Sequence, residues 1–477
     1  MKAKYQAIAS LLRDRQFKKA EDEAKEAVRR IPLDGQFWMM LGEALLHQGY
    51  GLAAKRVFER AWLLDPQAEW VHRMYDRIAS TPRGDERYDI EGLLHVPRVK
   101  VAAAILTRNE ASRISRCIEA LQAAVDEIIV VDSSTDETPE LAARYAKVKV
   151  IPIEWRDDFA AARNAALPHL QSDWVIWIDA DEELLAEDVG AIREVAGLFH
   201  NLETIPVLHV WHLNLVHGDI HHDFSQSRMF PLQRGLQFWG RIHEQIGTAE
   251  GIYGQDTYRR TVRIRLRHNG YDPEVVKTRG KLERNIRLLR LMIEEEPGNP
   301  GHYLYLGREL LASGEQQQAA EMLRRAEQLA LQTPSFGRQL DIYKLLVHLM
   351  IEQRKYAEAE SYCLKALEYE PNFPDAHYLL AQVRIRQADE LYRLAEEALH
   401  AAVRYLPSYR GTVNPDYQIG EWKAEAALAE AAIRSGRLSV ARSLLDKLKR
   451  HQPSWVEKRL TWIERERELL NASKPMD

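Results

Sequence analysis

Cysteine is scarce in this chain of 477 residues, which contains only Cys117 and Cys363. The two residues lie far apart in the sequence, and each falls within an apolar pattern that is typical of a helix. A network of disulfides is therefore excluded as the basis of the fold, and we expect a reducing compartment.

Long hydrophobic runs and a strong net charge are also absent. No stretch approaches the roughly 20 apolar residues that cross a membrane, and the start, MKAKYQAIASLLRDRQ, lacks the uninterrupted apolar core of a secretory signal. The 66 basic and 71 acidic residues give a net charge of -5, which favours neither nucleic acid nor a membrane surface as a partner. We therefore expect a cytoplasmic protein with no transmembrane segment and no nucleic-acid partner.

What the chain does contain is an internal repeat. Residues 35–66 carry small and apolar side chains at the spacing of a tetratricopeptide repeat, in which two antiparallel helices press together. A weaker copy precedes this one and ends at Pro32, and after a long gap further copies occupy 303–326, 343–371, 377–407 and 428–453. Stacked helix pairs form a concave groove that commonly binds peptides, although the N-terminal pair fits a structural clamp equally well.

Between the two repeat arrays, the sequence alternates apolar strands with helices. Strands are predicted over 101–106, 127–132, 148–153 and 174–179, with helices over 113–125, 140–146 and 160–170. This order predicts right-handed crossovers and a parallel sheet that helices cover on both faces. Ligands of such sheets bind at the carboxyl ends of the strands, which here read TRNE, DSSTDET and DADEE.

These patterns predict an α/β domain combined with all-α segments. A length of 477 residues suits about three domains. The predicted order is repeats over 1–80, a linker over 81–97, a middle domain over 98–275 and repeats over 276–477. Residues 409–420 interrupt the second array and are expected to form an exposed loop.

The fourth predicted strand ends abruptly in acid. Asp179, Asp181, Glu182 and Glu183 occupy four of five consecutive positions, so their charges need compensation. Asp179 and Asp181 are separated by one residue and point the same way off a strand. Carboxylate oxygens of this kind suit Mg²⁺ or Mn²⁺ bound to a diphosphate. The alternative is a helix N-cap with acid in the first turn.

Four ordered blocks carry a resemblance to a known family: VAAAILTRNEASRISRCIEAL, DEIIVVDSSTDET, WRDDFAAARNAAL and DWVIWIDADE. Over residues 98–270 the chain resembles family-two glycosyltransferases, which have the GT-A fold, a Rossmann-like sheet. It is similar to the branch that is fused to tetratricopeptide repeats and includes bacteriocin peptide glycosyltransferases. One departure is the turn Ser133-Ser134-Thr135-Asp136, which lacks the glycine that the family usually has after the acid.

The resemblance implies a nucleoside site at the first two strand exits. Thr107, Asn109 and Glu110 would contact the nucleobase. Asp132 would bind the uracil or its ribose.

The resemblance also implies a diphosphate site at the acid-rich strand end. Asp179 would touch the ribose or the donor sugar, and Asp181 would hold the metal that bridges the diphosphate. Arg163 would face the pyrophosphate, or else pair with Asp157 or Asp158.

The segment FWGRIHEQIG, residues 238–247, lacks the second histidine of H-E-x-x-H, which disfavours a metalloprotease. The resembling branch has an I-H-E block here, near the sugar and the acceptor. Glu244 is therefore the candidate general base, with His243 as its rival. The alternative is that Glu244 only bonds local backbone N–H groups or Arg241.

Further along, RHNGY resembles the H-x-G-Y block of the same branch. His268 would be a third metal ligand, which suits Mn²⁺ better than Mg²⁺, and its alternative is an ordinary loop histidine. Arg284 and Asn285 are expected to fix the helix that leads into the second array. A second group of polar residues lacks the spacing of a structural zinc site and is expected to be turn and solvent-facing. These residues are His217, Asp219, His221, His222 and Asp223.

The sequence therefore predicts a metal-dependent, inverting glycosyltransferase that uses a nucleotide-diphosphate sugar, most simply a UDP-sugar. It would transfer a hexosyl or N-acetylhexosaminyl group to a peptide, protein or glycan held by the repeats, with oligomerisation through repeat ends left open. The alternative is a non-catalytic scaffold with a degenerate glycosyltransferase domain. A nucleotidyltransferase is disfavoured because no glycine-rich phosphate loop follows the first strand.

Overall fold

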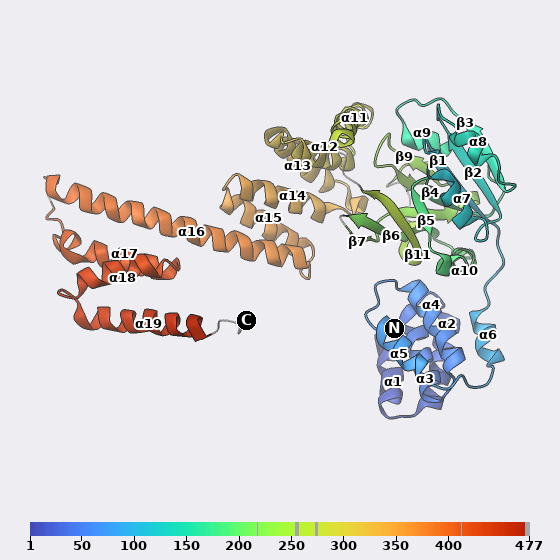
Figure 1. Ribbon diagram of the computed structural model, residues 1–477, viewed down its shortest axis with the longest axis horizontal. Helices are drawn as coiled ribbons and strands as arrows, with labels where there is room; N and C mark the ends of the chain where they lie inside the picture. The colour runs from blue at the N-terminus through green and yellow to red at the C-terminus, as the bar shows by residue number, and fades with distance from the viewer. Residues whose placement is uncertain (217, 253–256, 272–274, 412, 473–477) are drawn as a thin grey trace. The chain divides into compact units, whose positions relative to one another are not determined.

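The computed structural model describes residues 1–216, 218–252, 257–271, 275–411 and 413–472 (Figure 1). The chain divides into two compact units, Met1–Ser313 and Gly314–Asp477. Among the described residues, no helix combines the length and the apolar character needed to cross a membrane.

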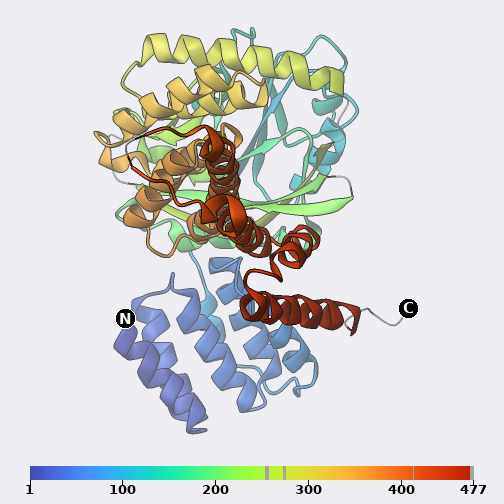
Figure 2. The same ribbon diagram turned by 90° about the vertical axis from the view of Figure 1, so that its left-hand side faces the viewer.

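The N-terminal segment consists of antiparallel helices that lie side by side (Figure 2). They are α1 (Lys2–Arg13), α2 (Phe17–Arg30), α3 (Gly35–His47), α4 (Gly51–Leu64) and α5 (Val71–Ala79). The small residues of the repeat pattern let the helices approach closely. Ala20, Ala24 and Ala54 are fully buried, and a Cβ atom added to Gly42 would lie 2.8 Å from the Phe58 ring. The predicted helix pairs are therefore present.

The predicted linker over 81–97 contains a short helix, α6 (Tyr88–Leu94). Ile90 of α6 is fully buried, and Arg56 of α4 forms an ion pair with Glu91. The prediction of a plain linker is incomplete, because this segment packs against the N-terminal helices.

Glu21 of α2 holds that packing together electrostatically. Its side chain is fully buried and accepts hydrogen bonds from Arg87, Lys25 and Gln48 Nε2, the last at 2.9 Å. Burial raises the pKa of Glu21, but the hydrogen bonds from Arg87, Lys25 and Gln48 outweigh it and bring the pKa to about 2.

Replacing Glu21 with glutamine is therefore expected to make unfolding easier in a pH-dependent way. The folded pKa lies below the ordinary value of 4.5, so the carboxylate contributes stability above that pH and loses its contribution as the pH falls toward 2. The difference in unfolding free energy should be about 3 kcal/mol at pH 7. In parallel urea titrations of the two proteins, it should shrink to less than half by about pH 3. A difference that stays constant over that range would contradict this role.

The middle of the first unit is a mixed sheet in the order β3-β2-β1-β4-β8-β6-β11-β5, with β7 paired to β6. The strands are β1 (Val101–Thr107), β2 (Glu127–Asp132), β3 (Val148–Pro152), β4 (Trp174–Asp179), β5 (Glu182–Leu184), β6 (Ile205–Val216), β7 (Asp219–Asp223), β8 (Ser227–Pro231) and β11 (Thr257–Tyr271). The first four are parallel, as predicted, and β8 joins β4 antiparallel. A separate hairpin consists of β9 (Gln237–Trp239) and β10 (Gln245–Gly247).

Both faces of the sheet are covered. Alternate residues of β1 belong to two different cores: Val101 and Ile105 to one, and Ala102 and Ala104 to the other. The first core includes residues of α7 (Ile114–Leu121), α8 (Thr138–Ala142) and α10 (Ala191–Phe199). The second core includes residues of α9 (Phe159–Asn164) and the β9–β10 hairpin. The prediction of a doubly covered sheet is therefore correct.

Two helices after the sheet, α11 (Val275–Glu295) and α12 (Pro300–Ala312), complete the first unit. The compact unit thus ends at Ser313, and the boundary at 275 between the middle domain and the second array stays a prediction. Side chains of α12 contact the sheet domain, since His243 Nε2 lies 3.2 Å from Glu309 Oε1.

The second unit contains the remaining helices. They are α13 (Gln316–Ala330), α14 (Gln339–Glu352), α15 (Tyr356–Tyr369), α16 (Pro374–Tyr405), α17 (Ala424–Arg434), α18 (Leu438–Leu448) and α19 (Pro453–Ala472). The repeat predicted over 377–407 is wrong as a helix pair, since α16 is one continuous helix of 32 residues. No glycine or proline interrupts its sequence after Pro374, and its alanine, leucine, glutamate and arginine residues favour helix throughout. An irregular segment follows α16, as predicted, although residue 412 lies outside the described residues.

Candidate active site

The carboxyl ends of three parallel strands meet at one edge of the sheet. Thr107 of β1 lies opposite Asp132 of β2, and Leu106 lies opposite Asp179 of β4. A cavity of about 680 Å³ opens there, and side chains from the sheet, α9, the β9–β10 loop and α11 line it. The site is therefore where a parallel sheet is expected to bind a ligand.

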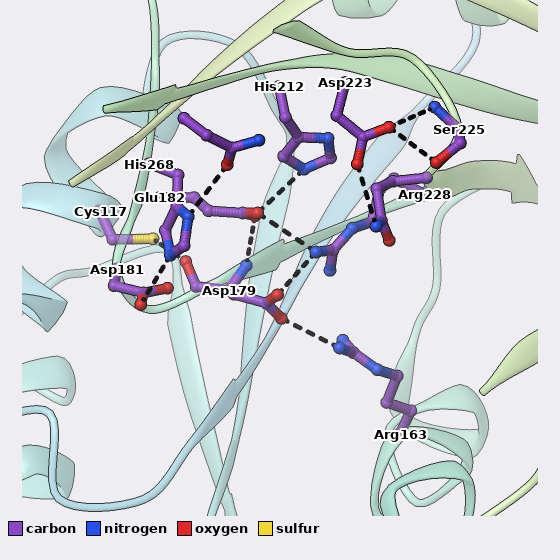
Figure 3. Close-up of polar contacts among 12 residues, drawn as sticks. Cys117, Arg163, Asp179, Asp181, Glu182, His212, Asp223, Ser225, Arg228 and His268 are labelled. Atoms are coloured by element: carbon purple, nitrogen blue, oxygen red, sulfur yellow. Dashed lines mark hydrogen bonds and ion pairs between the residues drawn. The ribbon is translucent and has the colours of Figure 1, made fainter. Parts of the chain in front are cut away.

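Asp179 is held between two arginines (Figure 3). Arg163 Nη2 donates a hydrogen bond to Asp179 Oδ1 at 3.0 Å, and Arg228 Nη2 donates to Oδ2 at 2.6 Å. Burial raises the pKa of Asp179, but the charges of Arg228 and Arg163 outweigh it and hold that pKa well below its usual range. Asp179 is therefore a fixed carboxylate anion.

The other acids after β4 are also compensated. Glu182 is buried and lies 3.2 Å from Arg228 Nη2 and 2.9 Å from His212 Nε2, and Glu183 pairs with Arg116 at 2.5 Å. Glu182 begins the short strand β5 instead of a helix, so the alternative of an N-cap is wrong.

The Asp181 side chain lies beside His268, which belongs to strand β11. His268 Nε2 lies 3.1 Å from Asp181 Oδ2, and His268 Nδ1 lies 3.1 Å from Asn214 Oδ1. The hydrogen bond to Asp181 raises the pKa of His268. A carboxylate oxygen and an imidazole nitrogen are a donor pair that fits Mn²⁺ or Mg²⁺. The described residues contain no group of three histidine, cysteine or acidic side chains placed to hold an ion, so further ligands would have to come from a substrate or water.

Arg163 has different partners from those predicted. Asp157 pairs with Arg287 at 2.7 Å, and Asp158 caps α9 by accepting from Ala161 N at 2.8 Å. Arg163 instead binds Asp179 and donates from Nε to Glu244 Oε1 at 2.7 Å, with its guanidinium over the Trp177 and Phe238 rings. The prediction of pairing with Asp157 or Asp158 is wrong, because α9 directs this side chain into the cavity.

The expected nucleoside residues divide into two groups. Thr107 and Glu110 line the cavity, whereas Asp132 is buried and accepts from Thr107 Oγ1 and Ser134 Oγ, both at 2.6 Å. Asn109 has a left-handed backbone with φ 58°, and its side-chain oxygen accepts from Thr135 N at 2.8 Å. Asp132 and Asn109 thus shape the turn that lacks the family's glycine. Their contact with a nucleobase stays a prediction.

His243 and Glu244 both line the cavity, but they contact different parts of the protein. Glu244 bonds Arg163, and Arg241 pairs with Glu295 at 2.5 Å, so the alternative that Glu244 bonds Arg241 is wrong. His243 Nε2 lies 3.2 Å from Glu309 Oε1 of α12.

The polar group on the β6–β7 hairpin is not a metal site among the described residues. Asp219, His221 and His222 are exposed, and Asp223 accepts from Ser225 N at 2.8 Å. His217 lies outside the described residues. The expected exposure to solvent is thus confirmed for Asp219, His221 and His222, whereas the expectation is wrong for Asp223, which is half-buried and lines the cavity.

Comparison with known proteins identifies the parts of the chain. Residues 103–198 match the profile of glycosyl transferase family 2, and residues 5–68 match the tetratricopeptide repeat profile. The chain therefore contains a glycosyl transferase family 2 domain and tetratricopeptide repeats. The predicted family, fold class and enzyme class are thereby confirmed.

Relatives of this glycosyltransferase include the SPbeta prophage-derived glycosyltransferase SunS of Bacillus subtilis. It is 28% identical over 308 residues, which span 63% of this chain and 71% of SunS. An uncharacterized glycosyltransferase of Rickettsia felis is 44% identical over 89 residues, or 18% of this chain and 31% of that protein. The crystal structure of S. aureus TarS is 16% identical over 55% of this chain and 54% of that chain, with a TM-score of 0.33.

Several residues of this glycosyltransferase site could not be assigned a role from the sequence. They are His212, Arg228, Tyr305, Arg308 and Glu309. Arg228 directly precedes the apolar residues Met229 and Phe230, which was a signal that this arginine has a buried partner. The α12 residues carried no such signal, because their spacing is that of an ordinary repeat helix.

Proposed function

We propose that this glycosyltransferase transfers a sugar from a UDP-sugar, with inversion and with Mn²⁺ or Mg²⁺ as cofactor, to a peptide, protein or glycan acceptor. The observation that carries the proposal is the pairing of Asp181 with His268 beside the two arginines that hold Asp179. The Asp181–His268 pair would hold a metal ion, and the two arginines carry positive charge in the same cavity. Together these groups suit a diphosphate.

Asp181 and His268 would hold the cation, with diphosphate oxygens as further ligands. A divalent ion bound there would neutralise charge that develops on the departing diphosphate. Among the described residues, Arg163 Nη1 and Arg228 Nε are buried and have no hydrogen-bond partner. Both arginines line the cavity, and their positive charges favour an anionic ligand there.

The reaction would be a single displacement at the anomeric carbon of the sugar. The acceptor atom attacks from the face opposite the diphosphate, and a side chain on the acceptor side takes its proton. Glu244 and His243 are adjacent in the chain and both line the cavity, so each is a candidate proton acceptor.

The acceptor proposal rests on the repeats. Helix pairs form grooves that commonly bind extended chain segments, which favours a peptide or protein over a small molecule. The fold suits a hydroxyl, a thiol or an amine as the acceptor group.

The direct test is release of UDP from UDP-glucose and from UDP-N-acetylglucosamine, with Mn²⁺ and with a chelator. We expect UDP release from at least one donor and its loss on chelation. No turnover and no thermal shift across a panel of nucleotide sugars would favour a non-catalytic scaffold. Release of pyrophosphate in place of UDP would indicate a nucleotidyltransferase.

A further inference from the structure

The loop of residues 240–244 places two candidate bases, His243 and Glu244, at the cavity, and the two side chains have different contacts. His243 has a left-handed backbone with φ 52°, which is rare for a residue other than glycine and has an energetic cost. Such a conformation persists only where the surroundings fix it. The contacts of the His243 side chain with α12 do so.

Three side chains of α12 contact the His243 imidazole. Its Nε2 lies 3.2 Å from Glu309 Oε1, and its ring stacks on Tyr305 with centroids 4.5 Å apart and planes at 29°. Arg308 Nη2 lies 3.1 Å from His243 Nε2, 3.5 Å from His243 Nδ1 and 3.4 Å from Glu309 Oε1. The Glu309 side chain is only 12% exposed, so the carboxylate is fixed in place.

Glu309 is ionised in this setting. Burial raises the pKa of Glu309, but its hydrogen bond with His243 and the charge of Arg308 outweigh burial and lower it. When His243 Nε2 donates to the Glu309 carboxylate, the tautomer of the ring is fixed and Nδ1 is the nitrogen that can take a proton.

Glu244 contacts a different part of the protein from His243. Its Oε1 accepts from Arg163 Nε at 2.7 Å, and the same guanidinium binds Asp179. Glu244 is therefore part of the network that positions the buried arginine on the donor side.

We propose that Glu309 of α12 is a positioning residue that orients His243, and that His243 is the proton acceptor of the transfer reaction. This inference rests on the proposed function. The acceptor's O–H, S–H or N–H proton passes to His243 Nδ1 as the acceptor atom bonds to the anomeric carbon. The bond from that carbon to the diphosphate oxygen breaks, and the nucleoside diphosphate leaves with the electron pair. Glu309 stabilises the resulting imidazolium, which returns its proton to water.

A consequence concerns the repeats. The helix pair α11–α12 supplies side chains to the reaction, so the start of the second array is part of the catalytic unit and not only an acceptor-binding extension. This agrees with the end of the compact unit at Ser313.

The test compares the full-length parent with Glu309→Gln, Glu309→Asp and His243→Gln, and with Glu294→Ala as a control for loss of an exposed acid on α11. The measured quantities are kcat and KM for UDP release, the Kd for UDP with Mn²⁺, and the melting temperature. We expect Glu309→Gln to lower kcat by about 10- to 100-fold and His243→Gln by about 100-fold or more. The KM and the Kd for UDP should stay within about twofold, Glu309→Asp should recover part of kcat, and the control should match the parent.

A Glu309→Gln protein with the parent's kcat would overturn the inference, as would a fall in UDP affinity and melting temperature that parallels the fall in kcat. Either result leaves the proposed function intact, because the parent still releases UDP. Only absence of UDP release by the parent counts against the proposed function itself.

Discussion

Replacing Asp181 with alanine is expected to lower the rate of UDP release by about 10³-fold, the loss that corresponds to roughly 4 kcal/mol of transition-state stabilisation. The reason is that Asp181 would supply the carboxylate ligand of the cation, opposite His268 Nε2 at 3.1 Å. The measurement is initial-rate UDP release over a range of Mn²⁺ concentrations. Asp219→Ala, which removes an exposed carboxylate from β7, is the control and should match the parent.

The metal dependence separates a ligand role from a packing role. If Asp181 holds the cation, UDP should bind the variant with an affinity that no longer depends on Mn²⁺, while the melting temperature without metal stays near that of the parent. A variant with the parent's rate and the parent's Mn²⁺ dependence would remove Asp181 from the metal site.

Replacing Arg228 with methionine is expected to lower the unfolding free energy of the first unit by about 3–5 kcal/mol. Arg228 is buried and donates to both Asp179 and Glu182, so its loss leaves the buried Glu182 and the partly buried Asp179 without their shared cation. The measurement is the urea transition that reports on the sheet, followed by tryptophan fluorescence, since Trp174 and Trp177 are fully buried in β4.

A matched control for this substitution is Lys149→Met, which removes an exposed cation from β3 of the same sheet. The control should change the unfolding free energy by less than about 0.5 kcal/mol. An Arg228→Met protein as stable as the parent would show that the acids find other partners or are protonated at neutral pH.

The order of strands in the first half of the sheet was predictable from the sequence. Val101 to Leu106, Glu127 to Asp132 and Trp174 to Asp179 are short apolar runs that end in polar residues, and helix-forming segments separate them. Parallel strands with such connections have their carboxyl ends at one edge of the sheet. The polar residues at those strand ends were therefore expected to lie close together.

The partners within the site were not predictable, because they depend on pairings between distant strands. His268 reaches Asp181 because β11 pairs antiparallel with β5, where His268 lies opposite Glu182. Arg228 reaches Asp179 because β8 lies beside β4. Neither pairing follows from local propensity, and only the resemblance to a family made His268 a candidate metal ligand.

The contribution of α12 illustrates a different limit. Tyr305, Arg308 and Glu309 occupy ordinary positions of a repeat helix, and periodicity assigns them to the array. Their contact with His243 depends on how the helix pair α11–α12 packs on the β9–β10 loop, and this packing is a property of the tertiary structure. The same limit explains α16, where the repeat spacing suggested a turn but uninterrupted helix-forming residues decided the outcome.

We propose above all that Asp181 and His268 bind a divalent cation beside the diphosphate of a bound nucleotide. The most direct test is a crystal structure of the full-length protein with Mn²⁺ and UDP, with the ion located by anomalous scattering. We predict one strong peak bound by the Asp181 carboxylate, His268 Nε2 and diphosphate oxygens. A structure with UDP in the cavity, Asp181 still hydrogen-bonded to His268 and no ion between them and the diphosphate would contradict it.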